Sequence, residues 1–314
     1  MEAKWGWKIT TNWEKKGLII MPSGKENSVS HCQPPLPFLL KNDIYRIFYG
    51  SRNSKNYTQI FYCDYDIKKL QVLHQTSNPI IASGKEGFFD ENGIYPSSIV
   101  QNDENNFMYT IGYSKGYDGM FYMRIGLAKG DDQNYFIRYS EAPILNTSEY
   151  DPWIVTAPFV LKDKGIFRMW YVSGDKCIRI KGKLESKYQI KYAESRDGIT
   201  WIREGVISIG YKNSAETNIA RPWVIKEDGI YKAWYCYCSR GEGYRIGYAE
   251  SRDGGYTFKR MDHLAGIYPS DEPWESEAVS YPAVIVHNGL KYMFYNGNKF
   301  GKDGIALAVE EKKQ

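Results

Sequence analysis

The sequence contains no apolar run that approaches the roughly 20 residues needed to span a bilayer. Its first residues, Met1 to Trp7, also lack the charged segment followed by an apolar stretch that begins a secretory leader. These absences predict a cytoplasmic protein without a membrane partner, although an engineered start that had replaced a leader would allow export.

Cysteine is scarce, and the excess of basic charge is small. The five cysteines are odd in number, and none stands in a C-x-x-C pair of the kind that holds zinc. A net charge of +4 over 314 residues, without a basic tail, does not favour a nucleic-acid partner. Glycine-rich phosphate loops and G-x-S-x-G elbows are absent. We therefore expect no cofactor and no metal.

Aromatic residues, in contrast, are abundant. The chain has 27 Tyr and 9 Trp residues, a composition that favours strands over helices. Its length allows a large core, and no shift in composition marks a boundary. We predict one all-β domain spanning residues 1–314.

One sequence unit occurs five times along the chain. Each copy reads as an apolar strand that begins near a proline, a short polar turn, and a second strand rich in aromatic residues. The anchoring prolines lie about 60 residues apart and are Pro37, Pro96, Pro158, Pro222 and Pro282. This spacing accommodates one four-stranded blade. The repeat predicts a five-bladed β-propeller whose blades start near residues 31, 90, 151, 216 and 275.

The fifth blade lacks a fourth strand, because the chain ends soon after Val309. Residues 13–20, Trp-Glu-Lys-Lys-Gly-Leu-Ile-Ile, match residues 201–208, Trp-Ile-Arg-Glu-Gly-Val-Ile-Ser, in the fourth strand of the third blade. We expect residues 13–20 to lie beside the last blade and to close the ring, leaving no open sheet edge.

Two turns resemble the Asp-box of sialidases and related propellers. They are residues 195–201, Ser-Arg-Asp-Gly-Ile-Thr-Trp, and residues 251–258, Ser-Arg-Asp-Gly-Gly-Tyr-Thr-Phe. The Asp of such a turn hydrogen-bonds its backbone while the aromatic residue packs into the blade. We predict a structural role for both turns.

Acidic residues recur at one position of the repeat. In a propeller the segments entering the first strands lie at one end of the central channel, and here they carry carboxylates in four of five blades. The residues about six positions before each proline are His31, Asp90 with Glu91, Asp151, Glu216, and Glu275 with Glu277. The recurrence predicts a ring of carboxylates around the channel mouth.

Asp151, followed by Pro152, and Glu216 resemble two of the three carboxylates of the five-bladed arabinanase and β-xylosidase group of glycoside hydrolases. Invertase-like and mannoside phosphorylase-like families are related to that group. The resemblance implies that Glu216 protonates the leaving oxygen and that Asp151 tunes it. It also implies an Asp in the first blade that acts as the general base. This sequence has His31 at that position.

The missing first-blade acid has two candidate replacements. Asp90 or Glu277 would activate water or another acceptor, and His31 is a further candidate as an acid, a base or an anion ligand. The catalytic set predicted from the sequence is therefore Glu216, Asp151, Asp90 and Glu277.

The loops between second and third strands carry basic residues, including Arg52, Lys55, Lys115 and Arg240. A basic collar suits an anionic or substituted sugar, such as a uronate, a sugar phosphate or a nucleotide sugar. Trp153 and Trp274 flank acids, where an indole can stack on a sugar ring. The predicted substrate-binding residues are His31, Arg52, Trp153, Arg221, Arg240, Trp274 and Glu275.

Three functions are compatible with these features. We favour a glycosidase-like enzyme that cleaves a glycosidic bond by carboxylate acid/base catalysis. The first alternative is a glycoside phosphorylase or a transferase that uses a sugar phosphate or nucleotide sugar. The second is a non-catalytic carbohydrate-binding propeller, because a fold alone does not assign a function.

Overall fold

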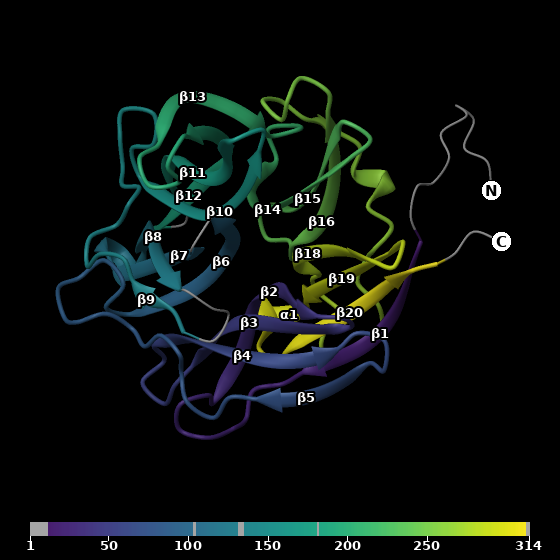
Figure 1. The fold of residues 1–314 in the computed structure, drawn as a ribbon. Coiled ribbons are helices and arrows are strands. Elements are labelled where there is room, and N and C mark those ends of the chain that lie inside the picture. The colour runs from purple at the N-terminus through teal and green to yellow at the C-terminus, as the bar shows by residue number, and fades with distance from the viewer. Residues whose placement is uncertain (1–11, 103–104, 131–134, 181, 312–314) are drawn as a thin grey trace.

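The computed structural model describes residues 12–102, 105–130, 135–180 and 182–311. These residues form 20 strands and three helical segments of at most four residues. Figure 1 shows the strands in groups that follow one another around the molecule in chain order, from purple through teal and green to yellow. The all-β class predicted from the sequence is confirmed.

The first two groups of antiparallel strands form one eight-stranded sheet. The first group is β2 (Ser30–Lys41), β3 (Ile44–Arg52), β4 (Thr58–Asp66) and β5 (Gln71–Gln75). The second is β6 (Gly93–Asn102), β7 (Asn105–Lys115), β8 (Phe121–Gly130) and β9 (Ile137–Arg138). A single parallel pairing, between Thr58 and Gly93, joins β4 to β6.

The next two groups repeat this arrangement. The third group is β10 (Ile154–Asp163), β11 (Ile166–Ile180), β12 (Lys183–Ser195) and β13 (Ile202–Ile209). The fourth is β14 (Glu216–Glu227), β15 (Ile230–Ser239), β16 (Arg245–Ser251) and β17 (Lys259–Arg260). Tyr188 and Asn218 make the single parallel pairing that links the two groups.

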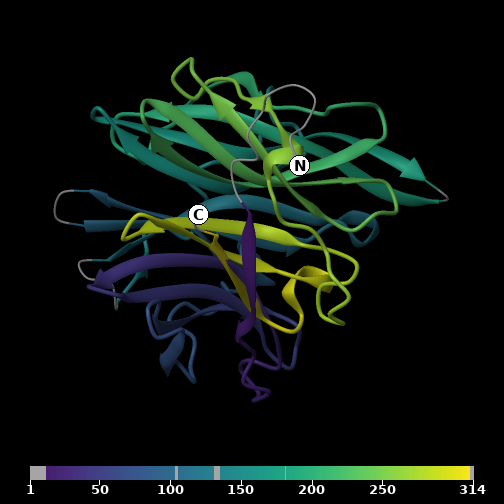
Figure 2. The same ribbon diagram turned by 90° about the vertical axis from the view of Figure 1, so that its right-hand side faces the viewer.

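The last sheet combines the two ends of the described chain. Its strands are β18 (Ser280–His287), β19 (Leu290–Asn296), β20 (Ile305–Glu310) and β1 (Trp13–Ile20). β1 pairs antiparallel with β20, from Trp13 opposite Glu310 to Ile20 opposite Ile305. In Figure 2 the purple β1 runs beside the yellow strands. The helical segments are η1 (Tyr117–Gly119), η2 (Asp262–Leu264) and α1 (Asn298–Gly301).

Aromatic pairs in the second strand of four groups form much of the core. Each ring is at most 1% exposed, so part of the abundant Tyr and Trp content lies in the core. The pairs are Phe48 with Tyr49, Trp170 with Tyr171, Trp234 with Tyr235, and Phe294 with Tyr295.

The two aspartate-containing turns each join the third and fourth strands of one group and contact the preceding group. The Asp197 carboxylate accepts hydrogen bonds from the backbone N–H groups of Ile199 and Thr200. Desolvation alone would raise the pKa of Asp197, but the hydrogen bonds lower it to about 2. Each turn also accepts a hydrogen bond from an aromatic side chain of the preceding group. Tyr109 donates to the Gly198 carbonyl at 2.9 Å, and Trp170 donates to the Gly255 carbonyl at 2.7 Å.

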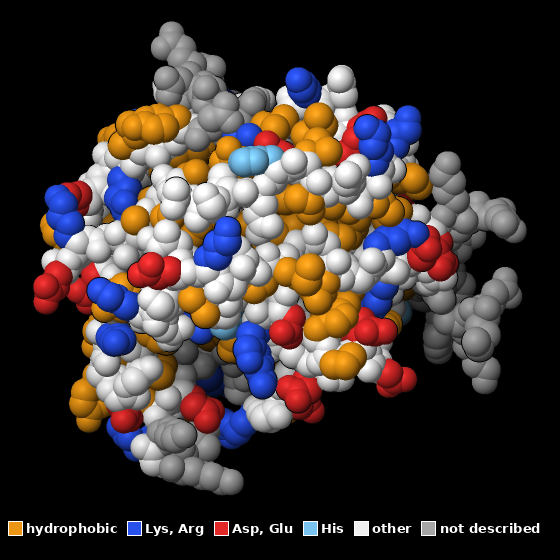
Figure 3. Space-filling model, turned by 90° about the horizontal axis from the view of Figure 1, so that it is seen from below, with side chains coloured by type: hydrophobic (Ala, Val, Ile, Leu, Met, Phe, Trp, Pro, Cys, Tyr) orange, Lys and Arg blue, Asp and Glu red, His pale blue; other side chains and the backbone are white. Residues whose placement is uncertain are grey.

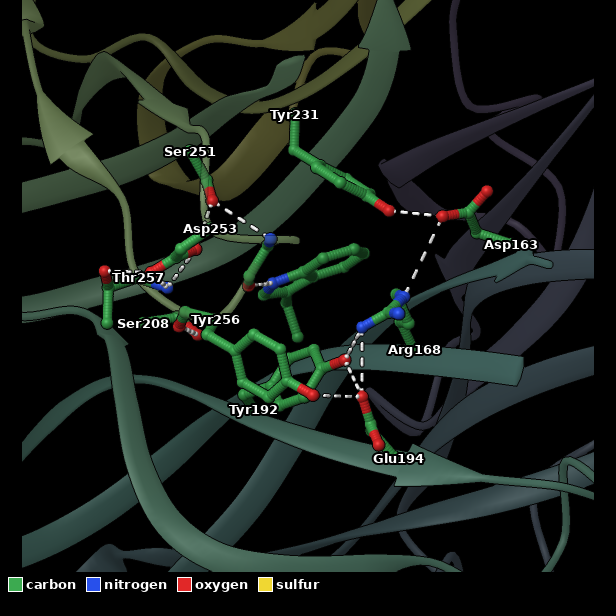
Figure 4. Close-up of polar contacts among 12 residues, drawn as sticks. Asp163, Arg168, Tyr192, Glu194, Ser208, Tyr231, Ser251, Asp253, Tyr256 and Thr257 are labelled. Atoms are coloured by element: carbon green, nitrogen blue, oxygen red, sulfur yellow. Dashed lines mark hydrogen bonds and ion pairs between the residues drawn. The ribbon is translucent and has the colours of Figure 1, made fainter. Parts of the chain in front are cut away.

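Figure 4 shows the contact between the third and fourth groups. Arg168 donates to Glu194 at 3.0 Å, and the Tyr256 hydroxyl donates to the same carboxylate at 2.9 Å. Tyr231 donates to Asp163 across the same junction. Charged and hydroxyl groups of the two adjacent strand groups are therefore paired near the buried Trp170.

Gly198 provides a test of this close packing. It has φ +74°, and a Cβ there would lie 2.8 Å from the Tyr109 hydroxyl and 3.1 Å from the Phe107 ring. We expect Gly198→Ala to lower the free energy of unfolding in urea by about 2–3 kcal/mol, from backbone strain and overpacking together. Gly229→Ala is the control, since Gly229 has φ +78° and nothing within 4 Å of its Cβ position. Equal losses in the two variants would contradict the close approach.

The outer surface mixes both signs of charge. Figure 3 shows Lys and Arg interspersed with Asp and Glu on the side seen from below the view of Figure 1. No helix in the described ranges is long and apolar enough to cross a bilayer.

Candidate functional site

A pocket of about 720 Å³ lies where the first strands of all five groups converge. Its lining includes Gln33 from β2, Tyr95 from β6, Ala157 from β10, Arg221 from β14 and Tyr281 from β18. Small-molecule sites typically measure about 300–1,000 Å³. This pocket is therefore the candidate functional site.

Residues directly before the anchoring prolines line the pocket in four groups. They are Tyr95, Ala157, Arg221 and Tyr281. Three of them have left-handed backbone, with φ +46° at Ala157, +49° at Arg221 and +54° at Tyr281. Each of the three lies in a β-bulge between the first and second strands of its group. Such backbone is strained for a non-glycine residue, and strain of this kind concentrates at functional sites.

Tyrosine is the most frequent aromatic residue of the lining. The six tyrosines are Tyr57, Tyr95, Tyr113, Tyr188, Tyr244 and Tyr281. Burial raises the pKa of Tyr188 to about 12 and also raises the pKa values of Tyr113, Tyr244 and Tyr281. These four hydroxyls stay neutral at physiological pH and can donate hydrogen bonds to a polar ligand.

The pocket carries more cations than carboxylates. Its cations are Arg52, Lys55, Lys115, Arg221 and Arg240, and its carboxylates are Glu185 and Glu242. Arg240 lies 3.7 Å from Glu185. Within the described part of the chain, Arg52, Lys55 and Lys115 form no ion pair. Among the described residues, these three pocket cations have no carboxylate partner.

Arg221 carries a buried positive charge at the pocket. It is 1% exposed, and its Nη1 donates to the carbonyl and hydroxyl oxygens of Ser97 at 2.8 and 2.9 Å. Nη2 donates to the Pro35 carbonyl at 3.3 Å, and Nε has no hydrogen-bond partner among the described residues. Desolvation lowers the pKa of Arg221 to about 10, so the guanidinium is still charged at pH 7.

The predicted ring of carboxylates is not part of this lining. Asp90, Asp151, Glu216 and Glu275 are all at most 3% exposed and lie outside the set of residues that line the pocket. Each accepts hydrogen bonds from a basic side chain on the outermost strand of its own sheet group. The pairs are Asp90 with Arg138 of β9, Asp151 with Arg203 of β13, Glu216 with Arg260 of β17, and Glu275 with Lys15 of β1.

These ion pairs are short and have further partners. Arg260 holds Glu216 through two nitrogens, at 2.6 and 2.8 Å. Tyr171 donates to both oxygens of Asp151 at 3.1 Å, and Tyr295 donates to Glu275 at 2.9 Å. Carboxylates that are buried and satisfied in this way tie each first strand to its outer strand, and their recurrence at one repeat position has a structural explanation.

Glu277 and the two tryptophans also lie outside the pocket lining. Glu277 is exposed, and its backbone carbonyl accepts from Arg245 at 2.8 Å. Trp153 packs against Tyr122 at 5.8 Å between ring centroids, and Trp274 against Tyr295 at 5.9 Å. Each indole therefore packs against a tyrosine, and its predicted contact with a sugar stays a prediction.

His31 is buried near Arg52 and does not line the pocket. Its Nδ1 shares a hydrogen bond of 2.8 Å with the Ser30 hydroxyl. Desolvation, followed by the positive charges of Arg52 and Lys302, lowers the pKa of His31 to about 4. The imidazole is therefore neutral at pH 7 and does not attract an anion by charge.

A pH-dependent stability follows from His31. Its folded pKa lies below the unfolded value near 6.5, so the unfolded chain binds the proton more readily between about pH 6.5 and 4. We expect this group to remove about 1–2 kcal/mol of stability as the pH falls from 7 to 5. Urea unfolding of wild type and His31→Gln at both pH values measures the effect. A decrease of the same size in both proteins would contradict it.

Three residues predicted to bind substrate come together in the pocket: Arg52, Arg221 and Arg240. Sequence reasoning missed Glu185 and Glu242, although they lie in the same second-to-third-strand hairpins in which the basic residues were noticed. The feature that could have identified them is the presence of acidic as well as basic residues in those hairpins. Within the described ranges, no group of three or more His, Cys, Asp or Glu side chains is arranged to hold a metal ion.

Comparison with solved structures identifies the fold. A glycosyl hydrolase from Bacteroides ovatus superposes with a TM-score of 0.75 at 12% identity, covering 100% of this chain and 96% of the other. A thermostable family-43 glycoside hydrolase gives a TM-score of 0.65 at 14% identity, covering 94% of each chain. The resemblance to propeller glycoside hydrolases is confirmed at the level of the fold.

Sequence comparison identifies a relative without a known function. No protein-family model matches the chain. The uncharacterized protein Rv1502 of Mycobacterium tuberculosis is 33% identical over 301 residues, covering 95% of this chain and 99% of the relative. The chain therefore belongs to the same family as Rv1502.

Proposed function

We propose that this protein is a carbohydrate-active enzyme of the glycoside hydrolase type that takes an anionic sugar into the central pocket. The observation that carries the proposal is the lining, in which five cations and six tyrosines accompany only two carboxylates. Tyrosine hydroxyls suit the hydroxyl groups of a sugar, and the cations suit an anionic substituent. Its glycoside hydrolase fold supports the carbohydrate assignment.

The architecture that we propose for this site is a five-bladed propeller in one domain. Each of the five strand groups would be a blade, and β1 would close the ring by completing the blade of β18, β19 and β20. The β1 to β20 pairing and the convergence of the five first strands on one pocket support this arrangement.

We propose Glu185 and Glu242 as the acid/base carboxylates in place of Asp90, Asp151, Glu216 and Glu277. Both proposed residues line the pocket, and neither is buried. Glu185 lies 3.7 Å from Arg240, whereas Glu242 forms no ion pair within the described part of the chain. Cleavage of a glycosidic bond needs one carboxyl group as acid and a second as base or nucleophile.

The test is a product-detected screen of neutral and anionic glycosides and nucleotide sugars, with and without phosphate. We expect Glu185→Gln and Glu242→Gln to lower turnover at least about 100-fold with unchanged melting temperature. Glu204→Gln, at an exposed position on β13, is the control and should keep full activity. Full turnover in both pocket variants, with loss in a folded Glu216→Gln, would instead support Glu216 as the acid.

A phosphorylase or transferase is the second candidate function. It is favoured by Arg52, Lys55 and Lys115, which form no ion pair within the described ranges. Turnover that requires phosphate, or that proceeds only with a nucleotide sugar, would identify this class. Saturable sugar binding without product under every condition would identify a non-catalytic binding protein.

A further inference from the structure

The charges of the pocket are separated between two walls. Arg52 ends β3, Lys55 follows it in the loop to β4, and Lys115 ends β7, all in the first two strand groups. The carboxylates of Glu185 and Glu242, with Arg240, belong to the third and fourth groups. A ligand in this pocket therefore meets positive charge on one side and mixed charge on the other.

Arg221 adds its charge to the positive side. It originates on β14, but its guanidinium donates to the Pro35 carbonyl of β2 and to Ser97 of β6. The guanidinium of this fourth-group residue thus contacts the first strands of the first two groups. We call Arg52, Lys55, Lys115 and Arg221 together the cationic wall.

The backbone that presents the cationic wall is held by buried hydrogen bonds. The Thr58 hydroxyl lies 2.9 Å from the Tyr113 hydroxyl, and the Thr58 N–H donates to the Asn92 carbonyl at 3.3 Å. The Asn92 side chain in turn accepts the Lys115 N–H at 2.7 Å. Because Thr58 and Asn92 are buried, the ends of β3 and β7 have fixed positions before any ligand binds.

From this arrangement we infer that the cationic wall is a phosphate subsite. The ligand would be a phosphorylated sugar whose phosphate or diphosphate contacts the wall while its sugar ring faces Glu185 and Glu242. The inference rests on the proposed function, and it specifies the anionic group and its orientation.

The number and type of cations favour phosphate over a sugar carboxylate. One carboxylate carries a single charge, which one arginine can match with two hydrogen bonds. A phosphate monoester carries about −1.5 to −2 charges and three acceptor oxygens, and a diphosphate extends over a longer distance. The lysines at 55 and 115 add point charges of the kind that bind phosphate, next to the neutral Tyr113 hydroxyl.

The experiment is calorimetric titration of the full chain with pyrophosphate, glucose 1-phosphate, UDP-glucose, glucuronate and glucose. We expect pyrophosphate to bind with a Kd of about 1 mM or lower, whatever sugar the natural ligand contains. Glucose 1-phosphate binding more tightly than pyrophosphate would indicate a sugar phosphate ligand, and UDP-glucose binding most tightly would indicate a nucleotide sugar.

Two arginine variants separate a subsite from general attraction to a positively charged protein. We expect Arg52→Gln to weaken binding of the phosphorylated probes about 10- to 100-fold. Arg196→Gln removes the same charge from an exposed turn outside the pocket lining and should change binding less than about threefold. Circular dichroism and melting temperature check that both variants are folded.

Two results would overturn the phosphate subsite. One is the absence of binding by every phosphorylated probe, and the other is an equal effect of the two arginine variants. If glucuronate or a neutral glycoside were still bound or cleaved, the proposed carbohydrate function would stand and only the phosphate assignment would fall. If no saccharide were bound or cleaved in either assay, both would fail.

Discussion

Glu216→Ala is expected to lower the free energy of unfolding by about 3 kcal/mol, because it leaves the Arg260 guanidinium buried without its principal partner. The Arg260 side chain is only 10% exposed, and its remaining carboxylate contact is Asp262 at 2.8 Å. Desolvation alone would lower the pKa of Arg260, but the Glu216 hydrogen bonds and nearby negative charges raise it. Urea unfolding at pH 7 measures the loss.

Two further variants distinguish loss of the Glu216–Arg260 ion pair from loss of a carboxylate in general. Glu204→Ala removes an exposed carboxylate and should change stability by less than about 0.5 kcal/mol. Glu216→Ala combined with Arg260→Met should recover part of the loss, since no buried charge is then left unpaired. Wild-type stability in Glu216→Ala, with turnover abolished, would refute the structural role and restore Glu216 as the catalytic acid.

A chain that begins at Met21 is expected to lose cooperative folding. It lacks β1, so β20 would lose its outer partner and the hydrogen bonds of that pairing. It would also lose Lys15, which lies 2.7 Å from the buried Glu275 carboxylate, and Trp13, which donates to the Ala265 carbonyl at 2.9 Å. Circular dichroism and thermal melting detect the change.

Point substitutions make the same test without removing the strand. Trp13→Ala should cost about 3–5 kcal/mol, because the indole is 8% exposed. Glu14→Ala, at the next residue, should be almost neutral because its side chain is 60% exposed. A truncated chain that remains soluble and melts cooperatively would show that β1 is not required.

The strand pattern could be predicted because its signals are local. The apolar first strand, the polar turn and the aromatic second strand occur within about 15 consecutive residues of each copy. The match of residues 13–20 to a fourth strand located β1 through the same local pattern, and β1 pairs with β20. Local propensity and alternation are therefore sufficient for the elements and their class.

The candidate site was predicted only in part. Loop position was sufficient to select Arg52 and Arg240, because hairpins between second and third strands extend to the pocket. Position relative to the anchoring proline selected acids that lie outside the pocket lining. In four groups the residue directly before the proline lines the pocket, whereas Asp151 and Glu216, seven and six positions before their prolines, are buried in ion pairs.

The sequence by itself determined that this chain is a repeated all-β protein with aromatic second strands, because alternation and turn chemistry act over a few residues. Only the tertiary structure decided which charges are partnered. Lys15 reaches Glu275 across 260 positions, and Arg260 reaches Glu216 across 44. Asp151 and Glu216, catalytic candidates in the sequence, each pair with a cation that folding brings from another strand, whereas Arg52 has no ion-pair partner among the described residues.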